Sequence, residues 1–538
     1  MGNDLLSTYR CMVSMRCLLG SVCLLLALTN GAFGQNRQAP PGMFKDLDDE
    51  ILGDALIIHG KQLFIDDYII GEMQGVEKKL NQPVKHPLNP LMKKERPWEY
   101  AITYGAIVRD ERDGLYKQWY QIWNDEKDSI GSIGYATSRD GLKWDRPVTD
   151  EATGKNLIRF TPDEPWSGGP GVLIDERDPD PARRFKMIYI SKPNLKSSSL
   201  ASHVAWSADG IQWTQAAVNP AIPFSDTQVC PFWDTRLNRF VAFLRFGPPN
   251  VRLVTRIESE DFLHWSPKLT VVNKSKLDGP FSTDHYTMSA LPYAGVYLGL
   301  INTYHGETIK PIPEDKPWMD RKDVQLAFSR NGVTWHRVGK EGAISAKELR
   351  ADRDWQQTAK DAVFLPYGEF KKEWDWGSIA ATYHPPLVVD DEIRIYYTGI
   401  NGRNWHNYHK DASDHAIGLA TLRLDGFVSV NAGDERGSLT TKSLVFLGDT
   451  LEVNANARGG SLTVEALDPE GKVIEGFGIA DCAPITTDSI RHVMKWKDNP
   501  DCHLLQGRPI KLRFHLMNAK LYAFEPRIRH NHYLQSYD

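Results

Sequence analysis

Three features that would suggest a function at once are missing from this sequence. Beyond the N-terminal region no apolar run is long enough to span a bilayer, so no membrane partner is expected once that region is removed. Lys and Arg form no long stripe, and 64 of them balance 69 Asp and Glu to a formal net charge of −5, which argues against a nucleic-acid partner. Neither Cys-x-x-Cys nor His-Glu-x-x-His occurs, so the sequence predicts no zinc site.

The N-terminus has the features of a secretory signal. Arg10 and Arg16 precede an apolar run over residues 17–29, and Ala32-Phe33-Gly34 gives the small-x-small pattern of a cleavage site. We therefore predict a signal peptide over residues 1–34, a linker over 35–57 and a secreted or periplasmic protein.

Cysteine is scarce, and removal of the signal leaves only three of the six residues. Cys482 and Cys502 are near enough in sequence to join two neighbouring strands of a small domain, whereas Cys230 lies far away. In an oxidising compartment we expect one disulfide, Cys482–Cys502, and a free thiol at Cys230.

What the chain does have is a seven-residue signature that occurs four times. Each copy begins with Ser, places Asp or Asn two residues later and ends in Trp, and three copies carry the Asp-Gly or Asn-Gly pair that suits a tight turn. An apolar strand precedes each copy, so the repeat reads as a strand, a turn and an anchoring tryptophan. The copies span residues 138–144, 207–213, 259–265 and 329–335, with a degraded fifth at 422–427.

Working outward from the signature gives five units, each with three readable strands. A spacing of roughly 50 to 70 residues is typical of radially repeated sheets. The sequence therefore predicts an all-β fold: a five-bladed β-propeller over residues 58–430, closed by a strand over 63–70 that completes the last blade. After residue 430, alternating strands over 451–455, 461–467 and 510–516 predict a β-sandwich over 431–528, followed by a flexible tail over 529–538.

Five blades with a Ser-x-Asp-Gly-x-x-Trp turn after the third strand, followed by a sandwich, resemble the five-bladed propeller glycosidases of the glycoside hydrolase family 32 and 43 superfamily, and most of all its secreted bacterial family 32-like proteins. The resemblance implies a glycoside hydrolase with acidic residues converging at one mouth of a central channel. The Trp-Met-Asn-Asp-Pro and Glu-Cys motifs of family 32 are absent. This departure counts against fructan or sucrose as the substrate and leaves the acid and the nucleophile unassigned.

The first strand of each unit is the innermost, and in four units a carboxylate stands just before it or at its start. We expect Glu99, Asp226, Asp284 and Asp375 to meet at one mouth, since equivalent positions of a ring face the same axis. Two carboxyl groups are what glycosidic cleavage requires. We favour Asp226 and Asp284 as the catalytic partners, with Glu99 and Asp375 as stabilising groups. The second unit has Gly168 and Gly169 in place of an acid.

Residues beside these acids are candidates for substrate binding, because flat rings and hydrogen-bonding groups suit sugars. No organic cofactor and no metal ligand set is predicted, although converging oxygens would also suit calcium. Each acid has an alternative role in capping a turn or pairing with a nearby cation, and a non-catalytic carbohydrate-binding or scaffold propeller is the competing function. The binding candidates are Trp98, Tyr100, His285, Tyr286, Trp376, Arg403 and His406; His384 could bind substrate or be a loop residue.

Other conspicuous residues are interpreted as structural. Arg177-Asp178-Pro179 matches a family 32 triplet but falls after an inner strand, so we assign it to a turn. The aspartates of the signatures are expected to accept backbone hydrogen bonds, and their tryptophans to pack between blades. Arg245, Arg252 and Arg256 cluster too locally to form the arginine triad of sialidases.

Overall fold

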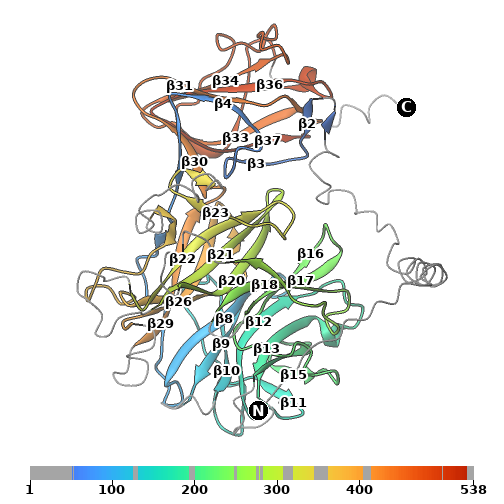
Figure 1. Cartoon of the computed structure of the whole chain (residues 1–538), viewed down its shortest axis with the longest axis vertical. Coiled ribbons are helices and arrows are strands. Elements are labelled where there is room, and N and C mark those ends of the chain that lie inside the picture. The colour runs from blue at the N-terminus through green and yellow to red at the C-terminus, as the bar shows by residue number, and fades with distance from the viewer. Residues whose placement is uncertain are drawn as a thin grey trace, which may run out of the picture.

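The computed structural model describes residues 51–52, 54–124, 131–192, 200–247, 251–273, 278, 283–306, 319–343, 361–403, 414–499 and 501–529. Over these residues the chain is all-β, as predicted, with short 3-10 turns such as η2 (Pro181–Arg183) and η4 (His503–Leu505). Figure 1 shows two groups of sheets, a lower one from β8 to β29 and an upper one that carries β30 to β37. The predicted signal peptide, most of the linker and nearly all of the tail lie outside the described residues.

The lower group consists of five mainly antiparallel sheets that follow one another along the chain, and the predicted strands of all five units are confirmed. We number the sheets in chain order. Sheet 1 contains β8 (Ala101–Asp110), β9 (Leu115–Trp123) and β10 (Gly131–Ser138). Sheet 2 contains β11 (Arg159–Thr161), β12 (Ser167–Ile174), β13 (Phe185–Ser191), β14 (Ala201–Ser207) and β15 (Gln212–Gln215). Sheet 3 contains β16 (Cys230–Asp234), β17 (Arg239–Phe246), β18 (Leu253–Ser259) and β19 (Leu269–Val272).

The remaining two sheets of this group are larger. Sheet 4 contains β20 (Thr283–Tyr293), β21 (Val296–His305), β22 (Arg321–Ser329), β23 (His336–Gly339), β24 (Gly342–Ala343) and β25 (Val363–Leu365). Sheet 5 contains β26 (Ser378–Thr382), β27 (Leu387–Val389), β28 (Glu392–Ile400), β29 (His415–Arg423), β6 (Val84–Lys85) and β7 (Met92–Lys93).

The first long strands of the five sheets contact one another in a ring. β8 contacts β12, β12 contacts β16, β16 contacts β20, β20 contacts β26, and β26 contacts β8 again. Small residues allow this approach: a side chain at Gly105 would collide with Tyr383 and the Trp119 carbonyl, and one at Gly171 would collide with the Val229 carbonyl. The five strands therefore share one axis.

The signature turns have the predicted structure. In the first copy Ser138 Oγ accepts from the Gly141 amide at 2.8 Å, and Asp140 Oδ1 accepts from the amides of Leu142 at 2.7 Å and Lys143 at 2.9 Å. The other three copies repeat these bonds. Tryptophans of the turns contact aromatic rings of the neighbouring sheet: Trp144 meets Tyr396, Trp213 meets Trp119 and Trp335 meets Phe243.

The predicted turn at Arg177-Asp178-Pro179 is confirmed as well. It connects β12 to β13, and the Arg177 guanidinium lies 3.0 Å from the centre of the Trp233 ring. The turn follows the last residue of β12, so it lies at the opposite end of the strand from Ser167, the first residue.

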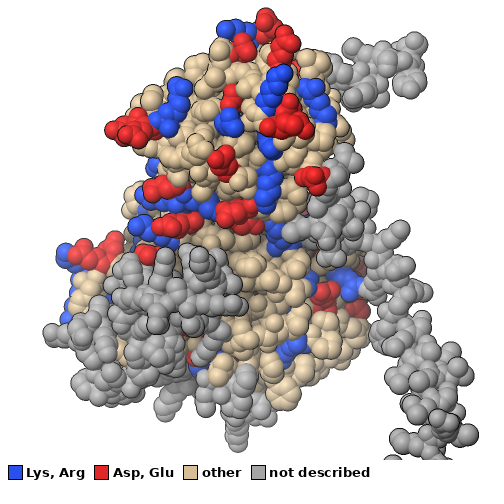
Figure 2. Space-filling view, turned by 45° about the horizontal axis from the view of Figure 1, so that its top comes forward, with Lys and Arg blue, Asp and Glu red and all other residues tan. Residues whose placement is uncertain are grey.

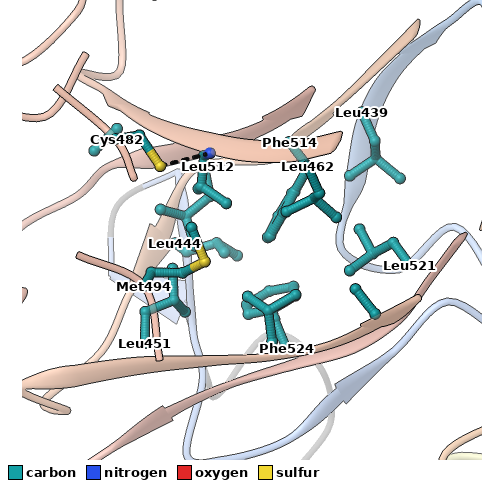
Figure 3. Packing of buried hydrophobic residues seen from close by; sticks show 14 of the residues in the cluster. Leu439, Leu444, Leu451, Leu462, Cys482, Met494, Leu512, Phe514, Leu521 and Phe524 are labelled. Carbon is teal, nitrogen blue, oxygen red and sulfur yellow. Dashed lines mark hydrogen bonds between the residues drawn. The ribbon is translucent and has the colours of Figure 1, made fainter. Parts of the chain in front are cut away.

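The upper group consists of two large sheets that enclose one core, and of one small sheet. One contains β35 (Asp488–Val493), β33 (Thr450–Asn456), β37 (Ala519–Arg527), β30 (Val428–Ala432), β5 (Glu77–Leu80) and β3 (Gln62–Leu63). The other contains β34 (Ser461–Leu467), β36 (Lys511–Met517), β31 (Gly437–Thr441) and β4 (Ile70–Gln74), and a small sheet joins β1 (Ile51–Leu52), β2 (Ala55–Ile57) and β32 (Leu444–Val445). Figure 3 shows leucines and phenylalanines from both large sheets meeting between them, among them Leu462, Phe514, Leu521 and Phe524.

The prediction that residues 63–70 complete the last blade is wrong. β3 pairs with β37 and β4 pairs with β31, both in the upper group, while β6 and β7 form the outer edge of sheet 5. The physical reason is burial: Phe64 is fully buried in the upper core against Phe514 and Phe524. The apolar pattern of residues 63–70 would suit any open sheet edge. In the structure these residues pair in the upper group, where Phe64 packs into the core.

The predicted disulfide is also wrong. Cys482 and Cys502 are separate buried thiols, as is Cys230. Cys482 Sγ accepts from the Val464 amide at 3.3 Å, whereas Cys502 Sγ lies 3.7 Å from the Gly448 carbonyl. Burial raises the pKa of Cys482 to about 11 and that of Cys502 to about 12, which keeps both thiols protonated at neutral pH.

Ion pairs connect the two groups of sheets. Arg423 pairs with Asp488 at 2.7 Å, and Lys61 pairs with Asp425 at 3.0 Å. Figure 2 shows acidic and basic side chains interspersed over the upper group and along this boundary, with no large patch of one sign on the face in view.

His384 ties the axis of the lower group together. It is fully buried and follows β26, and its Nε2 donates to the Pro231 carbonyl on β16 at 2.7 Å. Its Nδ1 lies 3.2 Å from Ser289 Oγ on β20, and its amide donates to the Gly105 carbonyl on β8 at 3.1 Å. This buried contact between sheets differs from both roles considered for His384, substrate binding and a loop position.

His384 should make the protein acid-sensitive. Burial lowers its pKa to about 4, below the ordinary 6.5, so the folded state binds fewer protons between these values and stability falls as the pH drops through that window. The variant His384→Gln keeps an amide donor but does not titrate. Between pH 7 and pH 4 its unfolding free energy should fall by about 3 kcal/mol less than that of the wild type, as measured by urea unfolding. An equal fall in both proteins would contradict this role.

Candidate active site

Two of the inner strands, β8 and β20, are irregular where their pairing with the next strand shifts. The pairing of β8 with β9 shifts between Thr103 and Gly105, and that of β20 with β21 shifts between His285 and Thr287. Each shift leaves one tyrosine outside the regular ladder, Tyr104 and Tyr286, and a bulge of this kind redirects the side chain that it carries. Tyr104 also has a positive φ of 27°, which is costly for a bulky residue.

Three cations gather around the ring of Tyr286. The Arg245 guanidinium lies 4.7 Å from the ring centre, that of Arg252 lies 5.0 Å away, and Lys322 Nζ lies 4.1 Å away. The ring is 5% exposed, and its hydroxyl is buried without a hydrogen-bond partner among the described residues. Cation–π attraction offsets part of the repulsion between the three charges.

Two of these cations hold the two predicted catalytic partners. Arg245 binds Asp226 through Nε at 3.0 Å and Nη2 at 2.8 Å, and Arg252 binds Asp284 through Nη1 at 2.7 Å. The Asp226 side chain is 54% exposed, whereas that of Asp284 is 4% exposed. Asp226 and Asp284 therefore approach Tyr286 from two neighbouring sheets, one carboxylate open to solvent and one buried.

Lys322 is the third cation and has no carboxylate within ion-pair distance in the described part of the chain. It stands opposite Tyr304 in the β21–β22 ladder, on the same face of sheet 4 as Asp284. Burial, with the charges of Arg245 and Arg252 adding to it, lowers the pKa of Lys322 to about 7. An amine with this pKa can hold or release a proton near neutral pH.

Tyr104 belongs to the same cluster. Burial raises its pKa, the nearby Arg245 opposes this, and Tyr286 and Asp226 add to it. The phenol therefore stays protonated at neutral pH and can donate a hydrogen bond to a ligand.

Glu99 is bound up in local contacts. It accepts from Tyr120 Oη at 2.9 Å and from Arg146 Nη1 at 2.8 Å, and two backbone amides of its own turn also donate to it. Its side chain is fully buried. No contact among the described residues joins it to Asp226 or Asp284.

Asp375 is placed similarly. Its Oδ2 accepts from Tyr397 Oη on β28 at 3.0 Å and pairs with Lys85 on the edge strand β6 at 2.7 Å, and the side chain is 1% exposed. Its Oδ1 is buried without a hydrogen-bond partner among the described residues. The meeting of all four carboxylates at one mouth thus stays a prediction, and the structure connects only Asp226 and Asp284 through a shared neighbour.

Of the predicted binding residues that the structure describes, Tyr286 belongs to the cluster of Asp226 and Asp284, and the others make contacts elsewhere. Tyr286 is central. His285 points to the other face of sheet 4, where its Nε2 accepts from Arg337 at 2.7 Å. The other described candidates have local contacts: Trp98 Nε1 with Asn156 Oδ1, Tyr100 with Lys94, Trp376 with Phe370 and Arg321, and Arg403 with the Met319 carbonyl. His406 lies outside the described residues.

The sequence analysis did not predict four members of the cluster. Arg245 and Arg252 were noted only as too local for an arginine triad, whereas Tyr104 and Lys322 were missed altogether. Lys322 lies beside the end of β21, the second strand of the fourth unit, but residues 306–320 separate it from that strand in the sequence. Tyr104 lies inside an ordinary apolar strand. The signal that could have found Tyr104 is the following Gly105, whose missing side chain permits the close approach described above.

The described residues contain no group of three or more His, Cys, Asp and Glu arranged to hold a metal ion. Within the same residues no helix has the length and apolar character needed to cross a membrane.

No protein-family model matches the chain, and no curated protein matches it. Among solved structures, a glycosyl hydrolase from Bacteroides ovatus is 15% identical over 64% of this chain and 94% of its own, with a TM-score of 0.41. A family 130 structure, from a group that contains glycoside hydrolases targeting beta-1,2 mannosidic linkages in Candida mannan, is 13% identical over 66% and 95%, with a TM-score of 0.42. An N-acetylgalactosamine deacetylase from F. plautii is 14% identical over 65% and 96%, with a TM-score of 0.42. These likenesses are weak, so function is inferred from the residues of the mouth.

Replacing Lys322 by Met should stabilise the protein most at low pH. The ordinary lysine pKa is near 10.5, so between about 7 and 10.5 the unfolded state binds more protons, and the cost of burying the charge is greatest below pH 7. We expect the stability advantage of Lys322→Met over wild type to be about 2 to 3 kcal/mol larger at pH 6 than at pH 9, as measured by urea unfolding. Lys117→Met is the control, because Lys117 is also buried but pairs with Asp110; a larger advantage at pH 9 would contradict the assignment.

Proposed function

We propose that the protein is a secreted glycoside hydrolase that cleaves a polysaccharide or oligosaccharide at one mouth of a five-bladed β-propeller, followed by a β-sandwich. The ring of contacts among the first strands of five sheets supports the propeller, and the shared core of the two upper sheets supports the sandwich. The proposal includes no organic cofactor. The observation that carries it is that Asp226 and Asp284 are held by two arginines, Arg245 and Arg252, which both contact the ring of Tyr286.

Asp226 is suited to the role of base or nucleophile. Its carboxylate is half exposed, so water or a sugar carbon can reach it, and the two bonds from Arg245 fix its orientation. Fixing a reactive group in this way removes part of the entropic cost of the reaction.

Asp284 is suited to stabilise charge. It is buried beside Tyr286 and held by Arg252, in a region of low dielectric where a carboxylate acts strongly on developing positive charge. Glycosidic cleavage passes through a positively charged oxocarbenium-like transition state.

Lys322 is the group best suited to protonate the leaving oxygen. A general acid works best when its pKa lies near the working pH, and the pKa of Lys322 is about 7. The sequence left the acid unassigned between the partners Asp226 and Asp284. His285, the neighbour of Asp284, turns away to Arg337.

Turnover assays on natural glycans and on aryl glycosides test these roles. Asp226→Asn should lower turnover about a thousandfold on both kinds of substrate, because both need the base. Lys322→Met should lower turnover about a hundredfold or more on natural glycans and far less on nitrophenyl glycosides, whose leaving group needs no proton.

The matched control is Glu176→Gln. Glu176 is also half exposed and bound by an arginine, Arg184, but it lies in the turn between β12 and β13. Its turnover should equal that of the wild type. An equal loss in Glu176→Gln and Asp226→Asn would refute the assignment of Asp226.

The competing function is a non-catalytic carbohydrate-binding propeller. It is favoured by Gly168 and Gly169, which leave sheet 2 without an acid at the start of β12, and by the local pairing of Glu99. Glycan binding without turnover, equal in the wild type and in Asp226→Asn, would support this function instead.

A further inference from the structure

Arg321 is a buried arginine that forms no ion pair with a carboxylate among the described residues. It begins β22 and is 2% exposed, and its Nε and Nη2 atoms are buried without a hydrogen-bond partner in the described part of the chain. The nearest acid along its own strand face is Asp323, which is bound to His305 Nε2 at 2.8 Å. A guanidinium is seldom buried unpaired, because its lost hydration is then not replaced.

The region around Arg321 carries further positive charge. Burial lowers its pKa, and the positive charge of Arg403 lowers it further, with Tyr367 acting in the opposite direction. Arg403 donates to the Met319 carbonyl at 3.0 Å and forms no ion pair among the described residues. Lys322, the next residue on β22, is a third cation that forms no ion pair within the described residues, although the charge of Asp320 acts on it. By contrast, Arg245 and Arg252 are each held by an aspartate.

Aromatic rings surround the Arg321 guanidinium. It lies 4.8 Å from the Tyr367 ring, 5.2 Å from that of Phe370 and 5.5 Å from that of Trp376. Flat rings beside a hydrogen-bond donor suit a sugar that carries a charged substituent. Because neighbouring residues on a strand face opposite sides, Arg321 and Lys322 lie on the two faces of sheet 4 at the same end of β22.

We propose that Arg321, supported by Arg403, binds an acidic group, a carboxylate or a sulfate, on a sugar unit next to the one that is cleaved. The substrate is then an acidic glycan. This inference rests on the proposed function only in taking the ligand to be a carbohydrate; the anion site itself is independent of turnover.

Small anions test the site directly. The full-length protein is titrated with sodium sulfate and with sodium acetate at constant ionic strength, with chloride as the balancing salt, and binding is followed by the fluorescence of the tryptophans and by the melting temperature. The variants are Arg321→Met and, as a matched arginine remote from the mouth, Arg394→Gln, which pairs with Glu392 near the start of β28.

We expect saturable binding of at least one anion to the wild type and to Arg394→Gln, and about tenfold or more weaker binding to Arg321→Met. Preference for sulfate over acetate identifies a sulfated sugar, and the reverse identifies a uronate. Without anion, Arg321→Met should melt at a higher temperature than the wild type, because it no longer buries an unpaired charge. Equal anion binding in the wild type and Arg321→Met, or a lower melting temperature in Arg321→Met without anion, overturns the proposal.

A turnover panel separates the two proposals. Oligogalacturonate carries carboxylates, a carrageenan oligosaccharide carries sulfates, and a galacto-oligosaccharide is neutral. Anion binding at Arg321 without cleavage of any glycan supports the anion site and refutes the proposed hydrolase activity. Cleavage of the neutral glycan alone, with no anion binding, supports the hydrolase activity and refutes the anion site.

Discussion

The close approach of five inner strands around one axis is the constraint on which the rest of the structure depends. Backbone comes so near to backbone that Gly105 and Gly171 admit no side chain, and polar groups that point inward must find partners there. His384 satisfies three of them at once, and Gln228 Nε2 donates to the Gly105 carbonyl at 2.7 Å. A neutral imidazole can serve in this place because it donates with one nitrogen and accepts with the other.

The strands and turns could be predicted from the sequence because their causes are local. The signature works through bonds within seven residues, so the Ser and Asp of each copy are sufficient to define the turn. The third copy keeps these bonds although Phe262 replaces glycine at a φ of 68°. The partners of residues 63–70 could not be predicted, because the apolar pattern of a strand does not specify which distant sheet edge it pairs with.

The candidate site could be predicted only in part, for a related reason. The positions of Asp226 and Asp284 before inner strands follow from the repeat, and Tyr286 follows from its neighbours. Whether a carboxylate stays accessible depends on cations that come from elsewhere in the chain, such as Lys85 for Asp375 and Arg146 for Glu99. The bulge at Tyr104 lies next to Gly105, which packs too closely against Tyr383 to carry a side chain, and no single strand reveals this contact.

The pairing of β3, β4 and β5 with strands after residue 428 has a consequence for biosynthesis. The chain enters and leaves the ring of sheets through the same upper unit, so strands made first must wait for partners made last. During synthesis the ring of Phe64 cannot pack against Phe514 and Phe524 until residues 510–527 have emerged. Contacts that span most of the sequence make folding slow and expose early segments to chaperones and proteases. The secretion proposed for this chain would require it to stay in this unfinished state until its last strands have crossed the membrane.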